Sequence, residues 1–367
     1  MIEFDDNILE RIVFQLSEYN FKNISADILG KIYQQHISRE ERKLLGQFYT
    51  PEWIIDFIIK RIPITRNKTI LDPACGSGGF LIRAYDKLRQ NYETDAIPKK
   101  DVHSLILKDN LFGFDIKPFA VQLTATNLVL KDLKNKTEHI NVFEKDSLAS
   151  SLDDWSKNHV KDLNNQSKLI SIGKAFPKEF DVIIGNPPYF NLKISDIKKK
   201  YPNENFGKIA VGKTNIASLF LKKYIDALKD GGYLGFVVPK SLLYVEPWEP
   251  IRKYILDNCN IKAIYDLREA FEDVKLEQIV IVLKKEVLEK KDMVDVYYKY
   301  YTKSGLEERH HKVKEELFTT SFFPIYLDDV NESIDKKANE NSIEVGKFCD
   351  ITRGPYLQKY KQILTKE

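Results

Sequence analysis

Short apolar runs rich in β-branched and aromatic residues alternate with stretches of helical spacing from Lys68 onward, and no other feature constrains the fold as much. The apolar runs read TILD, LFGFD, INVFEKD, FDVIIGNPPY, YLGFVVPK, IKAIYDL and QIVIVLKK; the helical stretches include FLIRAYDKL, FAVQLTATNLVL and SLFLKKYIDALKDGG. Strands that alternate with helices build βαβ units, whose strands lie parallel in one sheet. The pattern predicts an α/β fold with a doubly wound, mostly parallel sheet.

Composition indicates an ordinary globular protein. The chain has 367 residues, 43% of them hydrophobic and 30% charged, which suggests about two domains. Lysine and arginine total 57 against 54 aspartate and glutamate, so the net charge of +3 favours neither nucleic acid nor a membrane as a partner.

The cysteines, histidines and N-terminus predict a cytoplasmic protein with no metal and no membrane association. Cys75, Cys259 and Cys349 lie far apart with no CxxC pair, and the six histidines show no ligand spacing. The N-terminus is acidic and lacks the pattern of a signal peptide, and no apolar run approaches about 20 residues.

Three parts are expected along the chain. Residues 1–45 have helical apolar spacing and form an N-terminal extension, and residues 46–330 hold the α/β domain. Residues 331–367 begin with a polar, patternless stretch and continue as FCDITRGPY, which indicates a linker and the start of a truncated further domain.

A glycine-rich loop follows the first predicted strand. In TILDPACGSGGF, residues 69–80, Asp72 ends the strand and Gly76, Gly78 and Gly79 precede a helix, so backbone can approach a ligand closely. The spacing is not G-x-G-x-x-G and no Walker lysine follows, which disfavours hydride and phosphoryl transfer. A tight structural turn remains the alternative for this loop taken alone.

The next two strands also end in acidic residues. Asp115 ends FGFD, where a carboxylate can bind the two ribose hydroxyls of a nucleoside cofactor, although it could simply cap the next helix. Asp146 and Ser147 follow the third strand, at the same predicted edge, where a carboxylate can accept a hydrogen bond from an adenine amino group.

The strand FDVIIG breaks directly into Asn186, Pro187, Pro188 and Tyr189. Two prolines fix φ and remove two N–H donors, which makes a rigid turn with outward carbonyls. The Asn186 side-chain oxygen and the Pro187 carbonyl can both accept from a planar –NH₂ group, and Tyr189 can lie flat against the ring that carries it. A proline-rich turn after a strand is usually only a turn, but in combination with the upstream glycine-rich loop it is much more specific.

Residues 191–215 are expected to form a long polar loop. The loop carries six lysines, namely Lys193, Lys198, Lys199, Lys200, Lys208 and Lys213. A solvated, mobile insertion and a loop that faces DNA are both compatible with this composition.

Taken together, these motifs resemble those of the gamma-class adenine-specific DNA methyltransferases, and most of all the methyltransferase part of type IIG restriction–modification enzymes. The matching segments, in family order, are LGQFYTP (45–51), DPACGSGGF (72–80), FGFDIKP (112–118), KDSL (145–148), GNPPY (185–189), and the stretches KTNIASLF to KSLL and DLREAF to VLKK. The resemblance runs from about residue 24 to residue 285, with a further match in FCDITRG.

The resemblance implies a Rossmann-like fold of the S-adenosylmethionine-dependent type and a role for each matching residue. S-adenosylmethionine would contact Tyr49, Thr50, Pro51, Asp72, Ala74, Gly76, Asp115, Ile116, Asp146, Ser147 and Asn186. The catalytic motif would be Asn186, Pro187, Pro188 and Tyr189, with Phe271 as a second aromatic against the target base.

The implied reaction is transfer of the methyl group to the 6-amino group of adenine in double-stranded DNA, within a restriction–modification system. The base must leave the duplex to reach such a site. Because the resembling family carries a target-recognition domain after this one, a separate recognition or nuclease subunit is an expected partner.

Two alternatives remain open. Methyltransferases of protein glutamine side chains use a similar Asn-Pro-Pro-Tyr turn, and the chain could instead be a truncated cofactor-binding subunit that needs a separate recognition partner. Cytosine ring-carbon methylation is disfavoured because the Asn186–Tyr189 turn holds no cysteine nucleophile. Glu41-Arg42-Lys43 matches a bare nuclease E-x-K motif. It lies in the helical N-terminal extension, with too little chain before it to build a nuclease sheet.

Overall fold

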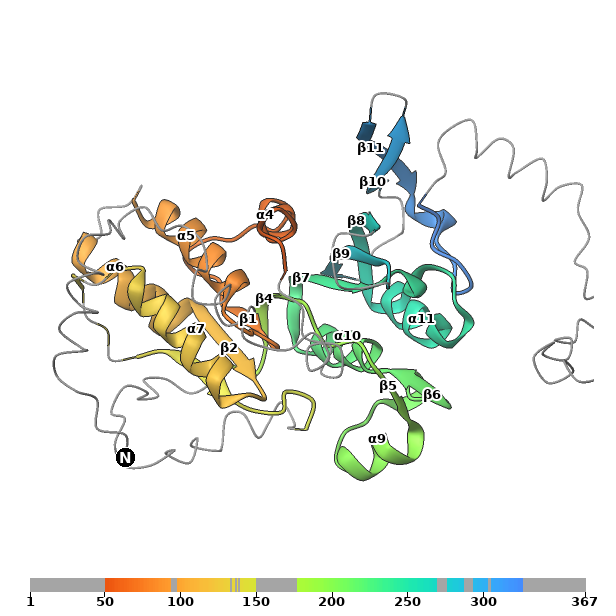
Figure 1. The fold of residues 1–367 in the computed structure, drawn as a ribbon, viewed down its shortest axis with the longest axis horizontal. Helices are drawn as coiled ribbons and strands as arrows, with labels where there is room; N and C mark the ends of the chain where they lie inside the picture. The colour runs from red at the N-terminus through yellow and green to blue at the C-terminus, as the bar shows by residue number, and fades with distance from the viewer. Residues whose placement is uncertain are drawn as a thin grey trace, which may run out of the picture. The chain divides into compact units, whose positions relative to one another are not determined.

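The centre of the computed structural model is a nine-stranded sheet (Figure 1). The model describes residues 50–93, 98–132, 134–135, 137, 139–149, 177–268, 276–286, 293–302 and 305–325. The strands of the large sheet are β1 (Ile70–Asp72), β2 (Leu111–Asp115), β3 (Asn141–Glu144), β4 (Phe180–Gly185), β7 (Leu228–Pro239), β8 (Cys259–Arg268), β9 (Gln278–Lys285), β10 (Met293–Thr302) and β11 (Gly305–Lys314). Their spatial order is β11-β10-β8-β9-β7-β4-β1-β2-β3.

The sheet is parallel over its first five strands in the chain. β3, β2, β1, β4 and β7 pair in parallel, which brings their carboxyl ends to one edge. β9 runs antiparallel between β7 and β8, so its first residue, Gln278, lies at that same edge. The predicted α/β class with a mostly parallel sheet is confirmed, whereas the outer pair of β10 and β11 was not anticipated from the sequence.

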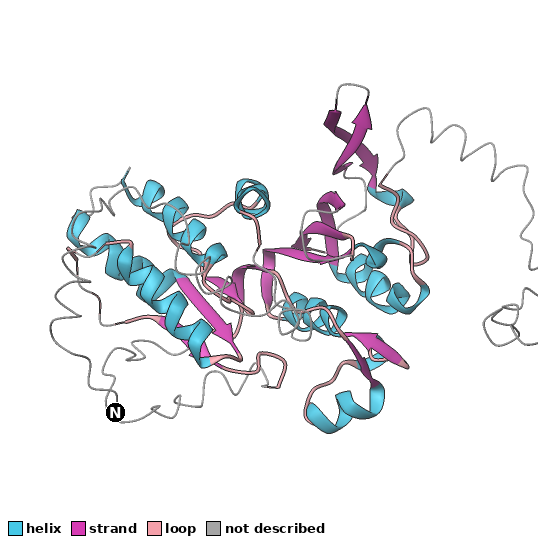
Figure 2. Cartoon of the chain, in the orientation of Figure 1, coloured by secondary structure: helices cyan, strands magenta, loops and turns pink. Residues whose placement is uncertain are grey.

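Helices cover both faces of the sheet, as Figure 2 shows. They are α4 (Glu52–Arg61), α5 (Gly79–Glu93), α6 (Lys99–Leu105), α7 (Pro118–Leu130), α9 (Ile194–Lys200), α10 (Ile216–Asp226) and α11 (Glu249–Asn258). Among the described helices, none combines the length and the apolar character needed to cross a bilayer.

Side chains of β9 alternate between two buried clusters. Ile279 and Ile281 belong to the cluster that α10 and α11 cover. Val280 and Val282 belong to the cluster that α4 and α5 cover. Burial on both faces, under helices on each side of the sheet, explains the continuous apolar run QIVIVL.

The segment Asn191–Asn215, here called the basic segment, is ordered and is not the expected loop. It contains β5 (Asn191–Lys193), α9 and β6 (Lys213–Asn215), and the two strands pair antiparallel in a sheet of their own. Its apolar side chains Ile197, Tyr201, Phe206 and Ile209 are buried in the α10–α11 cluster. Spaced apolar residues among the lysines therefore fix this segment to the domain, a signal that the lysine content obscures.

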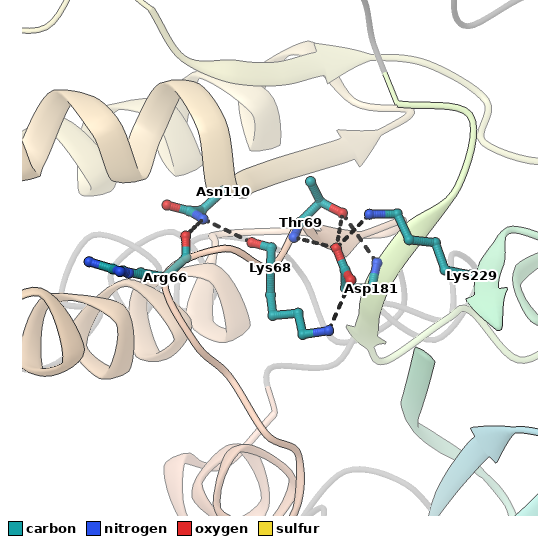
Figure 3. A network of polar contacts seen from close by, with 6 residues as sticks. All are labelled: Arg66, Lys68, Thr69, Asn110, Asp181 and Lys229. Carbon is teal, nitrogen blue, oxygen red and sulfur yellow. Dashed lines mark hydrogen bonds and ion pairs between the residues drawn. The ribbon is translucent and has the colours of Figure 1, made fainter. Parts of the chain in front are cut away.

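The half-buried carboxylate of Asp181 joins β1 and β4 at their amino ends (Figure 3). Asp181 accepts hydrogen bonds from the backbone N–H of Thr69 at 3.0 Å and from its hydroxyl at 2.9 Å. It also pairs with the ammonium groups of Lys68 at 3.1 Å and Lys229 at 2.7 Å. These contacts hold the pKa of Asp181 near 2, below its ordinary value, because several donors favour the ionised form over the cost of burial.

Asn110 makes a second link at this amino edge of the sheet, also seen in Figure 3. Its amide nitrogen donates to the carbonyls of Arg66 at 2.6 Å and Lys68 at 2.9 Å, just before β1. Together, Asp181 and Asn110 tie β4 and the start of β2 to the chain that enters β1.

We expect Asp181→Asn to lower the free energy of unfolding by about 1–2 kcal/mol at pH 7, since an amide cannot replace a carboxylate that accepts from two ammonium groups. The contribution should be full above about pH 4 and lost as pH falls through about 2, because the folded-state pKa is depressed.

Urea unfolding across this pH range measures the effect. Asp257→Asn is a matched control, because that carboxylate is 54% exposed and pairs with exposed Lys253. Equal stability losses for the two variants would contradict the account.

Candidate functional site

Three strand ends bring the predicted site residues of β1, β2 and β4 to the same edge of the sheet. Leu71 aligns with Phe112 on β2 and with Ile183 on β4. Asp72 and Asp115 end their strands there, and both carboxyl groups are nearly buried, at 1% and 7% exposure. Each strand end therefore delivers a polar group into one small region, as the sequence predicted.

Asp115 organises the glycine-rich loop. One carboxyl oxygen accepts from the N–H of Gly76 at 3.0 Å, and the other accepts from the N–H of Lys117 at 2.9 Å. Gly76 has φ +55°, which favours glycine, and a Cβ built on it meets nothing within 4 Å. Space beside a backbone held by a carboxylate is what a ligand needs to approach this loop.

Asp72 has an unsatisfied carboxyl oxygen. Its Oδ1 accepts from the Ala74 N–H at 3.1 Å, whereas its buried Oδ2 has no hydrogen-bond partner. Burial, together with the nearby charge of Asp115, raises the pKa of Asp72 to about 8. A buried carboxyl oxygen without a partner is costly, and a cationic ligand group would supply the missing bond and favour the ionised carboxylate.

Gly185 allows β4 to approach Asp72 closely. A Cβ at Gly185 would lie 2.7 Å from Asp72 Oδ1, which is shorter than any tolerable contact. The glycine before Asn186 therefore places the following turn directly beside the buried carboxyl group.

Three polar contacts hold the Asn186–Tyr189 turn. The Asn186 amide nitrogen donates to the Thr50 hydroxyl at 3.0 Å, which directs Asn186 Oδ1 the other way. The Tyr189 hydroxyl donates to Asn186 Oδ1 and lies 3.1 Å from the carbonyl oxygen of Val237 on β7. Burial raises the pKa of Tyr189, so this hydroxyl stays a neutral donor.

Thr50 therefore has a neighbour that the sequence did not reveal. The resemblance places it against the cofactor, while in the structure it is buried and bonded to the catalytic-motif asparagine. Pro51, the next residue, caps the N-terminus of α4, and its carbonyl accepts from the N–H of Ile54 at 3.0 Å.

Asp146, Ser147 and Ile116 lie at the β2–β3 end of the site. Asp146 pairs with the ammonium group of Lys200 at 3.0 Å and lies 3.4 Å from the Tyr201 hydroxyl, both in the basic segment. Ser147 is buried, and its carbonyl accepts from Tyr224 at 2.9 Å. Ile116 is 56% exposed directly after Asp115, an apolar surface where a ring could lie.

Two of the predicted site residues, Tyr49 and Phe271, lie outside the described residues. The contacts that the resemblance implies for them remain predictions.

The sequence reasoning missed one polar group at this edge, the amide of Gln278. Gln278 is 1% exposed, and among the described residues neither its amide nitrogen nor its amide oxygen has a hydrogen-bond partner. Only its position at the start of an apolar strand marks it in the sequence. Its burial depends on tertiary packing that no local pattern encodes.

The raised pKa of Asp72 predicts how stability responds to pH. Because the folded state favours the protonated carboxyl, the contribution of Asp72 to stability should be full below about pH 4 and lost as pH rises to about 8. Asp72→Asn should remove this dependence. Between pH 5 and 8.5, the free energy of unfolding of the variant should therefore rise relative to that of the wild type by more than about 1 kcal/mol.

Thermal or urea unfolding at a series of pH values measures this difference. Asp230→Asn, at an exposed position in β7, is the matched control and should follow the wild type. If the Asp72→Asn and wild-type stability curves run parallel, Asp72 does not titrate as described.

The comparisons with known proteins agree on a family. The family model for N-6 DNA methylases matches residues 24–349. The methylase subunit of the type I restriction enzyme EcoEI from Escherichia coli is 27% identical over 264 residues, covering 71% of this chain and 46% of that protein. The type II restriction enzyme and methyltransferase RM.Eco57I, also from Escherichia coli, is 27% identical, covering 76% of this chain and 33% of that protein.

Solved structures share the fold. MmeI, a type IIL restriction-modification enzyme solved in complex with DNA, has a TM-score of 0.58 at 17% identity and covers 85% of this chain and 46% of its own. The M protein of the type I enzyme EcoKI has a TM-score of 0.50 at 20% identity, covering 69% of this chain and 48% of its own. The chain thus spans half or less of these relatives. With a family model matched over most of its length, the chain belongs to the N-6 DNA methylase family.

Proposed function

We propose that this chain transfers a methyl group from S-adenosylmethionine to the 6-amino group of adenine in DNA, as part of a restriction–modification system. The observation that carries the proposal is the Asn186–Tyr189 turn, held by Thr50 and set beside the unpaired buried oxygen of Asp72. Family membership supports DNA over the side-chain amide of a protein glutamine.

The residues at the ends of β1 and β2 fit the cofactor. Asp72 Oδ2 is a buried acceptor without a partner, suited to the cationic amino acid part of S-adenosylmethionine. Space beside Gly76 admits a ligand next to Asp115, which can accept from ribose hydroxyls, and Ile116 offers an apolar surface for the adenine ring. When bound, S-adenosylmethionine supplies an activated methyl group on a sulfonium centre.

We assign Asp146 to the amino group of the cofactor's adenine. Its carboxylate follows β3 at this edge of the sheet and pairs with the ammonium group of Lys200 at 3.0 Å. Tyr49, Thr50 and Pro51 would close the methionine side, with Thr50 shared between the cofactor and Asn186.

Asn186 and Pro187 would activate the target amine. The lone pair of an exocyclic adenine amine is delocalised into the ring, so two acceptors that hold its hydrogens draw the nitrogen toward tetrahedral geometry and raise its reactivity. The Thr50 hydroxyl fixes the Asn186 amide with its oxygen available as one acceptor, and the rigid Pro187 carbonyl is the other. The positive charge that develops on the amine then lies against two oxygen dipoles.

Tyr189 would change partners when a base enters. Its hydroxyl now donates to Asn186 Oδ1, the atom that the target amine needs. Displacement of this hydroxyl leaves the aromatic ring to stack on the base, and Phe271 would contact the other face. Stacking of this kind is worth about 1–3 kcal/mol per base, which offsets part of the cost of flipping.

The basic segment supports DNA as the substrate. Lys193, Lys198, Lys199, Lys208 and Lys213 are exposed, and none pairs with a carboxylate among the residues described. Two nearby acidic groups are neutralised, since Asp146 pairs with Lys200 and Glu204 pairs with buried Lys223 at 2.9 Å. A positively charged surface that begins two residues after Tyr189 is suited to the phosphates beside a flipped base.

A separate subunit would complete the protein. The chain spans 46% of a relative that is itself named a methylase subunit. We therefore infer that sequence recognition, and any nuclease activity, resides outside the described residues, in further chain or in a partner.

We expect Asn186→Ala to lower kcat for DNA methylation by at least about 100-fold, since it removes one of the two acceptors and the group that orients it. Cofactor affinity should change less than about threefold, because Asp72, Asp115 and Asp146 remain. Single-turnover methylation and titration calorimetry with S-adenosylmethionine measure the two quantities.

Tyr189→Phe is the matched control for Asn186→Ala. It keeps the stacking ring and removes only the displaced hydroxyl, so kcat should stay within about tenfold of the wild type. A proportional loss of cofactor binding in Asn186→Ala would show that the turn holds the cofactor and not the target amine.

The double variant Lys198→Gln, Lys199→Gln should weaken DNA binding and reduce its salt dependence. Each lost phosphate contact lowers the slope of log K against log salt by about 0.9, so the slope should fall by about 1.8 in magnitude. Fluorescence anisotropy at several salt concentrations measures this slope.

The double variant Lys60→Gln, Lys87→Gln removes two exposed lysines outside the basic segment and should leave the slope unchanged. If both double variants change the slope equally, DNA does not prefer the basic segment.

A further inference from the structure

Gln278 occupies an apolar position with a polar side chain. It starts β9, opposite Pro239 at the end of β7 and Arg268 at the end of β8. Along its face of the strand follow Val280 and Val282, both fully buried among apolar side chains. A methionine at this position would continue the apolar face of β9 and would leave no buried polar atom without a hydrogen bond.

The unpaired amide of Gln278 destabilises the folded protein. Gln278 is 1% exposed, and its nitrogen and oxygen both lack partners. A buried amide with neither atom hydrogen-bonded destabilises a fold by roughly 1–3 kcal/mol per unsatisfied group. Such a residue is explained when a molecule that enters the site supplies the missing hydrogen bond.

β7 lies between β9 and β4 in the sheet (Figure 1). Gln278 on β9 and the Asn186–Tyr189 turn after β4 are therefore on opposite sides of β7. Gly185 on β4 aligns with Phe236 on β7, which in turn aligns with Ile281 on β9. β4 and β9 are therefore about 10 Å apart, which is twice the spacing between neighbouring strands. Tyr189 lies over β7 at Val237, between them.

A base held by its amine at Asn186 and Pro187 would extend its ring over β7 toward Gln278. Both amine hydrogens would then be occupied by the Asn186 and Pro187 oxygens. The remaining polar atoms of adenine are the ring nitrogens N1, N3 and N7, which accept hydrogen bonds and carry no hydrogen.

We propose that the Gln278 amide nitrogen donates a hydrogen bond to a ring nitrogen of the flipped adenine, which makes Gln278 a specificity-determining residue of the base pocket. The inference rests on the proposed function, since it needs adenine as the substrate. A donor at this position favours a base with an acceptor there and disfavours one that presents a hydrogen.

Gln278→Met tests the role because it keeps the volume and removes the amide. The variant should unfold at the same temperature as the wild type or higher, yet lose roughly 5- to 100-fold in kcat/KM for DNA methylation. S-adenosylmethionine affinity should be unchanged. Gln122→Met, at an exposed position on α7, is the matched control and should affect neither property.

Analogues of the target base identify the bonded atom. Oligonucleotides carry 1-deaza-, 3-deaza- or 7-deazaadenine at a site that the wild type methylates. One analogue should slow the wild type by about the factor lost in Gln278→Met and cause no further loss in that variant, while the other two act additively. Additive losses for all three analogues, or an unchanged kcat/KM in Gln278→Met, would overturn the role of Gln278. Absence of adenine methylation by the wild type would instead overturn the proposed function itself.

Discussion

The ion-paired carboxylate of Asp181 sets the alignment on which the site depends. It ties the amino end of β4 to the chain entering β1 through Thr69, Lys68 and Lys229. Because parallel strands share a direction, fixing their amino ends also fixes which residues meet at the carboxyl edge. Asp72 and Gly185 then approach so closely that no side chain fits at Gly185. An interaction at the opposite edge of the sheet thus fixes how closely the end of β1 and the Asn186–Tyr189 turn approach each other.

The carboxyl edge divides the chemistry between two regions. The ends of β1, β2 and β3 supply acidic groups, of which Asp72 has a raised pKa and an unpaired oxygen. The end of β4 supplies neutral acceptors on a rigid turn, and Thr50 orients the first of them. A cationic cofactor and a neutral amine need these different surroundings. In the proposed reaction the adjacent strand ends would hold methyl and amine in line, and no covalent enzyme intermediate is required.

The sequence predicted the α/β class, the acidic strand ends and the family, and these predictions are confirmed. They rest on local signals: β-rich runs, glycines, and prolines after a strand. The roles of individual site residues remain predictions. Long-range pairing was not predictable, as Asp181 is an ordinary strand residue until Lys229 is placed beside it. The same holds for the burial of Gln278, and the expected loop at 191–215 proved to be ordered because its few apolar residues reach the core.

Nucleoside analysis of DNA after incubation with the purified chain tests the central claim most directly. Genomic DNA from a strain without adenine methylation, S-adenosylmethionine with a labelled methyl group, and low salt give the reaction its best conditions. The account predicts labelled N6-methyldeoxyadenosine that accumulates with time and is absent with Asn186→Ala. Label in methylcytosine, in protein glutamine in a parallel incubation, or in no product at all would contradict it.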